Sequence, residues 1–154
     1  MKLLYVCTHN RCRSILSEAV TRSRAVSTID ARSAGSRPAG EVHPLSLKYL
    51  QQAGYDIEGL VSESWDAYAE WAPEVVITVC DRAAGESCPL YLGSAMKLHW
   101  GLEDPSALDG TETQIEAAFL STIKRIEQRV DQLNTIAQLP PTQWQSALSM
   151  LSIS

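Results

Sequence analysis

The sequence predicts an α/β domain of three layers, α/β/α, in which a mostly parallel four-stranded sheet lies between helices. Two observations predict this class. A short apolar run near the N-terminus leads through a polar loop into a helix-periodic segment, and further apolar runs then alternate with helix-periodic segments. Such alternation is typical of parallel strands joined by helical crossovers. The length of 154 residues fits a single domain.

The first 54 residues supply two strands and two helices. We expect a strand over residues 2–6 and a helix over residues 14–24, where apolar side chains recur every three or four positions. A second strand is expected over residues 29–34. The segment 44–53 is expected to be helical and to end at Gly54, although its apolar positions follow helical spacing less regularly.

The middle of the chain carries the clearest strand pattern. Residues 74–79 include a run of five β-branched side chains, which indicates a strand buried on both faces. A short helix is expected before it, over residues 65–71. A short fourth strand is expected after it, over residues 97–100.

A long amphipathic helix is predicted over residues 111–138. Its apolar side chains recur every three or four residues, and Thr111 with Gln114 fits a capping box. Two prolines end this helix. The apolar residues that follow them are spaced as in a short helix that docks on the body of the protein, with a partner-binding helix as the alternative. We therefore divide the chain into a domain of residues 1–137 and a C-terminal extension of residues 138–154.

Composition excludes several classes of protein. Hydrophobic residues make up 45% of the chain and charged residues 20%, so a core can form and disorder is not expected. The net charge of −5 argues against nucleic-acid binding. The first apolar run is too short for a membrane span or a secretory signal. We expect a cytoplasmic monomer with reduced thiols, so its four cysteines need an explanation other than structural disulfides.

The charge is distributed unevenly. Residues 1–32 carry a net charge of +4, residues 33–112 carry −9, and the remainder is neutral. A basic stretch is often only a solvated helix face. The alternative is a local anion site within an acidic protein, and the motifs have to decide between the two.

The loop at residues 7–13 has the features of an anion site. It lies where a strand ends and a helix begins, the edge at which parallel α/β sheets bind ligands. Backbone N–H groups and the helix N-terminus there favour an anion and the thiolate form of Cys7. Arg13 can grip two oxygens of a tetrahedral oxyanion, and Ser14 can donate a hydrogen bond to the thiolate. A buried structural cysteine is the alternative, but this combination of residues favours a nucleophile.

Residues 6–14, with the sequence VCTHNRCRS, resemble the signature loop of the low-molecular-weight tyrosine phosphatase superfamily. Two later segments resemble its arsenate reductase branch. One is the strand that ends in Cys80 and is followed by Cys88, and the other is HWGLEDP at residues 99–105. The resemblance covers residues 1–137 and implies a low-molecular-weight phosphatase fold.

This resemblance implies a reduction of arsenate by thiols. Cys7 would attack arsenic, Arg13 would stabilise charge on oxygen, and Asp104 would protonate the departing oxygen. Cys80 would then attack the Cys7 sulfur, and Cys88 would attack Cys80, so that arsenite leaves and a Cys80–Cys88 disulfide remains. Judged alone, Cys80 would be a core residue and Cys88 an incidental loop thiol. The oxyanion would lie on six loop residues: Thr8, His9, Asn10, Arg11, Cys12 and Arg13.

The resemblance also implies the partners of the reaction. No tightly bound cofactor is expected, and an external reductant, thioredoxin or glutaredoxin with glutathione, would regenerate the thiols. Phosphate and sulfate would bind as analogues of arsenate.

Other residues are expected to support the loop. Asn10, Glu18 and Ser33 match positions that hold a monovalent cation in some relatives, and Glu63 stands near an aspartate of those relatives. We favour a role in bracing the loop over ion binding. Cys12 is expected to be structural. No metal site is expected, because the histidines and cysteines show no zinc spacing.

Two other functions stay open at this point. A tyrosine phosphatase would use Cys7, Arg13 and Asp104 alone, because hydrolysis of a phosphocysteine needs water and no second thiol. A non-catalytic redox sensor or arsenic-binding module would keep the thiols without turning over arsenate. Cys80 and Cys88 favour the reductase over the phosphatase.

Overall fold

The computed structural model describes residues 1–81 and 93–151. Its centre is a four-stranded sheet in the order β2-β1-β3-β4, in which all neighbouring strands run parallel. The observed bounds of the strands differ from the predicted ones by one residue at most at each end. The strands are β1 at Lys2–Cys7, β2 at Asp30–Gly35, β3 at Val75–Thr78 and β4 at Met96–His99. The predicted α/β class with a parallel sheet is confirmed.

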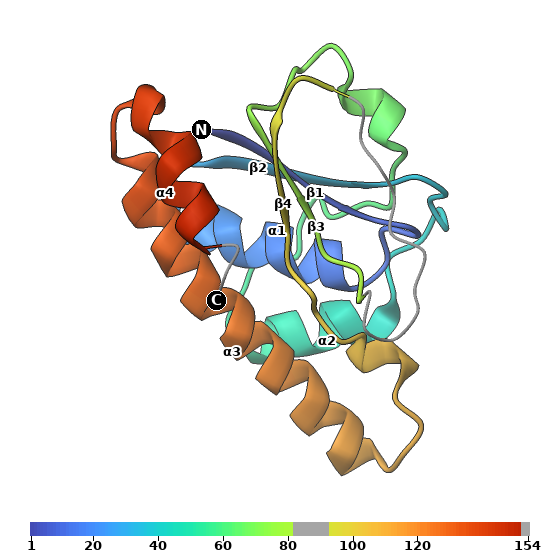
Figure 1. Cartoon of the computed structure of the whole chain (residues 1–154). Helices are drawn as coiled ribbons and strands as arrows, with labels where there is room; N and C mark the ends of the chain where they lie inside the picture. The colour runs from blue at the N-terminus through green and yellow to red at the C-terminus, as the bar shows by residue number, and fades with distance from the viewer. Residues whose placement is uncertain (82–92, 152–154) are drawn as a thin grey trace.

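Within the described residues, four α-helices lie on one side of the sheet (Figure 1). Their apolar faces and one face of every strand share a single core. The long helix begins with the predicted capping box, in which the Thr111 side chain and the Gln114 side chain each accept a backbone hydrogen bond from the other residue. The helices are α1 at Arg13–Arg24, α2 at Pro44–Gln52, α3 at Glu112–Ala137 and α4 at Trp144–Leu151.

The opposite face of the sheet has a thinner cover. Within the described ranges, this third layer is the 3-10 turn η1 at Trp65–Tyr68 with the residues that follow it. The helix expected over residues 65–71 is therefore shorter than predicted. Ala72 has a φ of 54°, and it precedes Pro73, a position where helical backbone is disfavoured.

The last helix packs against the body of the protein. It contacts α3 and β4, and Trp144 and Leu148 are its buried side chains. The division of the chain at residue 137 stays a prediction. Among the described helices, none is long and apolar enough to cross a membrane.

The register of the sheet places two cysteines at the ends of neighbouring strands. Val6 pairs with Thr78, and the Val79 N–H donates to the Val6 carbonyl at 3.0 Å. Cys80 is the next residue after Val79, and Cys7 is the last residue of β1. The two cysteines therefore lie at the same carboxyl edge of the sheet.

Candidate active site

The loop after β1 is held in place by its carbonyl oxygens. Those of Thr8, His9 and Arg11 each accept a hydrogen bond of 2.8 to 3.0 Å from a backbone N–H within residues 37–43. Because C=O and N–H of a trans peptide point in opposite directions, the N–H groups that follow these carbonyls face the other side of the loop. The Asn10 N–H shows this, since it donates to the Cys7 sulfur at 3.2 Å. The scaffold thus turns backbone donors toward the nucleophile.

Gly35, the last residue of β2, allows the loop to lie this close to the sheet. A Cβ atom at Gly35 would stand 2.6 Å from the Thr8 carbonyl oxygen and 3.1 Å from the Asn10 nitrogen. Any larger side chain would push the loop outward. Asn10 itself has a φ of 50°, a left-handed conformation that asparagine tolerates better than most residues. Sequence reasoning gave Gly35 no role in the site.

The Cys7 sulfur receives a second hydrogen bond from α1. The Ser14 hydroxyl lies 2.9 Å from the sulfur and accepts a hydrogen bond from the Asn10 side-chain amide at 2.8 Å. Its own proton is therefore available for the sulfur. Two donors on one sulfur stabilise the negative charge of a thiolate, as the sequence predicts for Cys7 and Ser14.

A cavity of about 280 Å³ opens in front of Cys7. It is lined by loop residues together with Asp104 and Ser106, which come from the segment after β4. The structure therefore brings the predicted oxyanion loop and the predicted proton donor to one place. The lining residues are Cys7, Thr8, His9, Arg11, Cys12, Arg13, Asp104 and Ser106.

Arg13 connects the loop to the segment that carries Asp104. Its Nη1 donates to the Leu102 carbonyl at 3.1 Å, and its Nη2 lies 3.7 Å from Asp104 Oδ2. The other carboxylate oxygen, Oδ1, accepts from the Ser106 N–H at 3.0 Å and from the Ser106 hydroxyl at 2.6 Å. Sequence reasoning missed Ser106, although an Asp-Pro-Ser order at a helix start is a recognisable capping pattern.

The remaining thiols differ from Cys7. Burial raises the pKa of Cys12 to about 12, so it stays a neutral thiol near neutral pH, which fits the expected structural role. Cys80 is fully buried and disulfide-bonded, whereas Cys7 and Cys12 are free. Cys88 lies outside the described residues, so its predicted pairing with Cys80 stays a prediction.

A buried chain of hydrogen bonds braces the loop from behind. The Asn10 amide donates to the Ser33 hydroxyl at 3.0 Å, which donates to Glu18 Oε1 at 2.5 Å. Asn10 Oδ1 accepts from the Glu63 N–H at 2.9 Å. Burial raises the pKa of Glu18, against the opposing effects of Ser33 and of Arg22, whose guanidinium donates to Glu18 at 3.2 Å.

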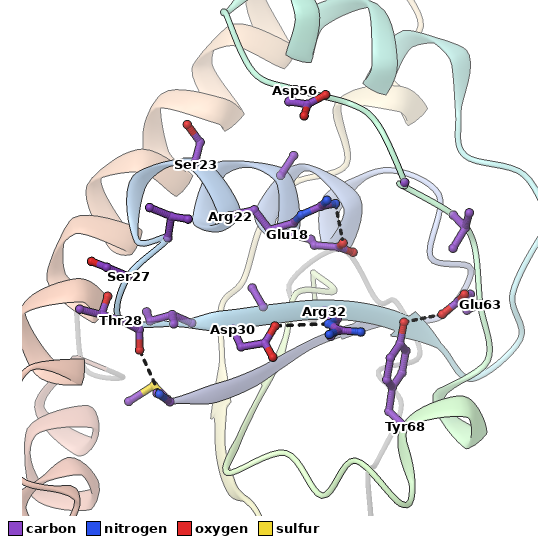
Figure 2. A pocket seen from close by; sticks show the side chains of 17 residues that line it. Glu18, Arg22, Ser23, Ser27, Thr28, Asp30, Arg32, Asp56, Glu63 and Tyr68 are labelled. Atoms are coloured by element: carbon purple, nitrogen blue, oxygen red, sulfur yellow. Dashed lines mark hydrogen bonds and ion pairs between the residues drawn. The ribbon is translucent and has the colours of Figure 1, made fainter.

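Behind this chain, α1 and β2 border a groove of about 860 Å³, which Figure 2 shows from close by. Its two arginines each pair with a carboxylate. Arg22 binds Glu18 as described, and Arg32 donates to the carboxylate of Asp30 at 3.3 Å. At the other end of the groove, a short hydrogen bond joins the Tyr68 hydroxyl to Glu63. Sequence reasoning missed Arg22, although it stands four residues after Glu18 on one helix face.

The four residues discussed for a monovalent cation fit a bracing network better than an ion site. The Asn10 carbonyl oxygen already accepts from Glu63, the Ser33 hydroxyl already donates to Glu18, and Arg22 neutralises the same carboxylate. Within the part of the chain that the structure describes, no group of three or more His, Cys, Asp or Glu side chains could hold a metal ion.

Known proteins of similar sequence agree with this geometry. Residues 2–142 match the model of the low molecular weight phosphotyrosine protein phosphatase family. The arsenate reductase of Bacillus subtilis is 31% identical over 119 residues, which cover 77% of this chain and 84% of the relative. That of Halalkalibacterium halodurans is 30% identical over 128 residues, which cover 83% of this chain and 91% of the relative.

Solved structures point the same way. An arsenate reductase from Archaeoglobus fulgidus superposes with a TM-score of 0.68 at 25% identity, over 84% of this chain and 98% of that one. The thioredoxin-dependent arsenate reductase of Corynebacterium glutamicum superposes with a TM-score of 0.66 at 31% identity, over 89% of this chain and 61% of that longer chain. This chain therefore belongs to the low molecular weight phosphotyrosine protein phosphatase family and, within it, to the branch of the arsenate reductases.

Proposed function

We propose that this protein reduces arsenate to arsenite with Cys7 as the nucleophile. One observation carries the proposal: two donors hold the Cys7 sulfur at a cavity that Arg13 and Asp104 share. A second cysteine, Cys80, follows the neighbouring strand, as a thiol-based reduction requires. The arsenate reductases named above are the relatives that support the choice of substrate.

In the first step, the Cys7 thiolate attacks the arsenic atom of an arsenate bound on the loop. An arsenic–sulfur bond forms and an arsenic–oxygen bond breaks, and the oxygen leaves as water after it takes a proton from Asp104. Arg13 and the loop N–H groups stabilise the charge on the remaining oxygens.

In the second step, the Cys80 thiolate attacks the Cys7 sulfur. The arsenic–sulfur bond breaks and its electron pair stays on arsenic, which passes from As(V) to As(III) and leaves as arsenite. Cys88 then attacks Cys80 and releases the Cys7 thiolate, so that a Cys80–Cys88 disulfide remains. The position of Cys80, one residue beyond the point opposite Cys7 at the carboxyl edge of β1 and β3, supports the first exchange, because a disulfide forms only between neighbouring cysteines, with Cα atoms about 4.4–6.8 Å apart.

We propose thioredoxin as the external dithiol that reduces the final disulfide, since the Corynebacterium glutamicum relative is thioredoxin-dependent. Glutaredoxin with glutathione is the alternative. Either system works in a reducing compartment, which agrees with the expected cytoplasmic location.

A single-turnover experiment tests the proposal without any reductant protein. Fully reduced enzyme is mixed with arsenate, and arsenite and free thiols are counted. We expect about one arsenite and the loss of two thiols per chain, as the electron balance of the proposed steps requires. Cys7→Ser should give neither. Cys80→Ser should trap arsenic on Cys7, and Cys88→Ser should stop at a Cys7–Cys80 disulfide. Full repeated turnover by Cys88→Ser with every reductant would overturn the three-thiol relay.

Alkylation provides an independent test of the anion site. Iodoacetamide should react with Cys7 before Cys12, and bound phosphate or sulfate should slow that reaction. Equal alkylation with and without phosphate would show that the loop does not bind an oxyanion in front of Cys7.

Phosphatase activity is the competing function, because the same loop could attack a phosphate ester. The described residues that line the cavity include no Phe, Tyr or Trp side chain on which a phenyl ring could stack. We therefore expect only weak hydrolysis of p-nitrophenyl phosphate. If wild-type protein leaves arsenate untouched while Cys80→Ser hydrolyses this ester rapidly, the phosphatase function holds instead.

A further inference from the structure

We infer that Ser106 is a positioning residue for Asp104: it fixes one carboxylate oxygen so that the other faces the departing oxygen of the substrate. This inference rests on the proposed reduction of arsenate, in which Asp104 supplies a proton. Ser106 itself is given no role in bond making or breaking.

One carboxylate oxygen of Asp104 accepts two hydrogen bonds, both from Ser106. Asp104 caps the 3-10 turn η3 at Pro105–Ala107, and its Oδ1 accepts the Ser106 N–H at 3.0 Å. The Ser106 hydroxyl donates to the same oxygen at 2.6 Å. The backbone bond would exist with any non-proline residue at this position, whereas the hydroxyl bond needs Ser or Thr.

The second hydrogen bond has a consequence for the proton. Each carboxylate oxygen offers about two lone-pair sites, and both sites of Oδ1 are taken. A proton that Asp104 holds for transfer therefore belongs on Oδ2. That oxygen lies 3.7 Å from the Arg13 Nη2, on the side of the cavity where the oxyanion would bind.

The hydroxyl matters because an aspartate carboxyl group turns easily. The χ2 torsion of aspartate has a broad, nearly two-fold profile, so one backbone hydrogen bond restricts it only loosely. The 2.6 Å hydroxyl bond is at the short end of the range for O–H···O hydrogen bonds, so it adds a second, well-defined restraint on this torsion. Ser106 also lines the cavity itself, so its loss would leave room in which the carboxyl group could turn.

The test measures the single-turnover rate of arsenite release at saturating arsenate and, separately, the affinity for phosphate. Ser106→Ala should slow the rate about tenfold, the order expected for losing one hydrogen bond to a charged group. Its phosphate affinity should stay within about twofold, because the loop that binds the anion is unchanged. Ser106→Thr keeps a hydroxyl and should restore most of the rate. Ser23→Ala, an exposed serine on α1, is the matched control and should behave as wild type.

A double-variant cycle separates positioning from a general loss of structure. If Ser106 acts through Asp104, Ser106→Ala should cost nothing further in an Asp104→Asn background. The inference is overturned if Ser106→Ala lowers the rate further in the Asp104→Asn background. It is also overturned if Ser106→Ala alone weakens phosphate affinity or leaves the rate at the wild-type value. If wild-type protein releases no arsenite, the proposed function fails, and the same cycle is read on the hydrolysis of phenyl phosphate, whose leaving group needs the same proton.

Discussion

The cavity in front of Cys7 and the groove between α1 and β2 differ in size and in the groups that they hold. The groove is the larger space, about 860 Å³ against about 280 Å³. Its guanidinium groups are paired with Glu18 and Asp30. In the cavity, Arg13 also pairs with a carboxylate, that of Asp104, but the same cavity holds a free thiol at which a backbone N–H and a serine hydroxyl meet. Hydrogen-bond donors that converge on a nucleophile therefore identify the reactive site, and the volume of a space does not. The groove lies behind the hydrogen-bond chain that supports the loop.

The largest effect should come from replacing the guanidinium group on the cavity side. Arg13→Lys keeps the charge but loses the planar fork that can hold two oxygens and reach the Leu102 carbonyl. We expect arsenite release to fall about 100-fold or more. The measurement is the single-turnover rate, with circular dichroism to verify folding. A folded Arg13→Lys protein with more than about half of the wild-type rate would show that bidentate binding is unimportant here.

A smaller loss should follow from Gly35→Ala, which acts on the loop through its support. The added methyl group would stand 2.6 Å from the Thr8 carbonyl oxygen, so the loop has to move. We expect a destabilisation of about 1–3 kcal/mol, typical of overpacking, together with weaker phosphate binding. Urea unfolding and a phosphate titration measure the two effects. Unchanged values in both would mean that the loop is not held as closely as described.

The groove should tolerate change better than the cavity. Arg22→Met removes the guanidinium partner of Glu18 but leaves the Ser33 hydrogen bond in place. We expect a loss of about 1 kcal/mol or less, as for a half-exposed ion pair, and arsenite release within about threefold of wild type. A loss comparable to that of Arg13→Lys would contradict the contrast between the two regions.

Glu18 should make the free energy of unfolding depend on pH. Burial raises its pKa in the folded protein above the ordinary value of 4.5. The folded state then binds this proton more tightly than the unfolded chain, so the contribution of Glu18 to stability is complete below that ordinary value and is lost as the pH rises through the folded pKa. Glu18→Gln cannot titrate. The free energy of unfolding of wild type relative to Glu18→Gln should therefore fall as the pH rises above the ordinary value of 4.5. A difference that stays constant across this range would contradict the assignment.

The smallest effect is expected from monovalent cations. Arg22 and Ser33 already satisfy Glu18, so replacing potassium chloride by choline chloride at equal ionic strength should change neither the unfolding temperature nor the rate of arsenite release. If potassium specifically raised both the unfolding temperature and the rate of arsenite release, the residues around Glu18 would bind a monovalent cation after all.

Local patterns predicted most of the fold and the front of the site. The β-branched run and the capping box of the long helix depend on neighbours in the sequence, and the structure confirms both elements. The thin layer around η1 was less predictable, because Ala72 and Pro73 interrupt an otherwise helical segment. Contacts over long separations gave no local pattern at all: Asn10 with Glu63, or Arg13 with Leu102, are visible only once the sheet has brought those segments together.

The parallel pairing of β1 and β3 also sets the spacing of the proposed relay. Each residue advances an extended chain by about 3.3 Å. One extra residue inserted between Thr78 and Cys80, in the segment that follows β3, would move the second thiol along the chain by about that length, while residues 7–13 stayed as they are. Such a protein would capture arsenate on Cys7 and keep it. The pairing of β1 and β3 would thus set the distance between the two thiols, and this distance would decide whether the protein only binds arsenate covalently or also reduces it.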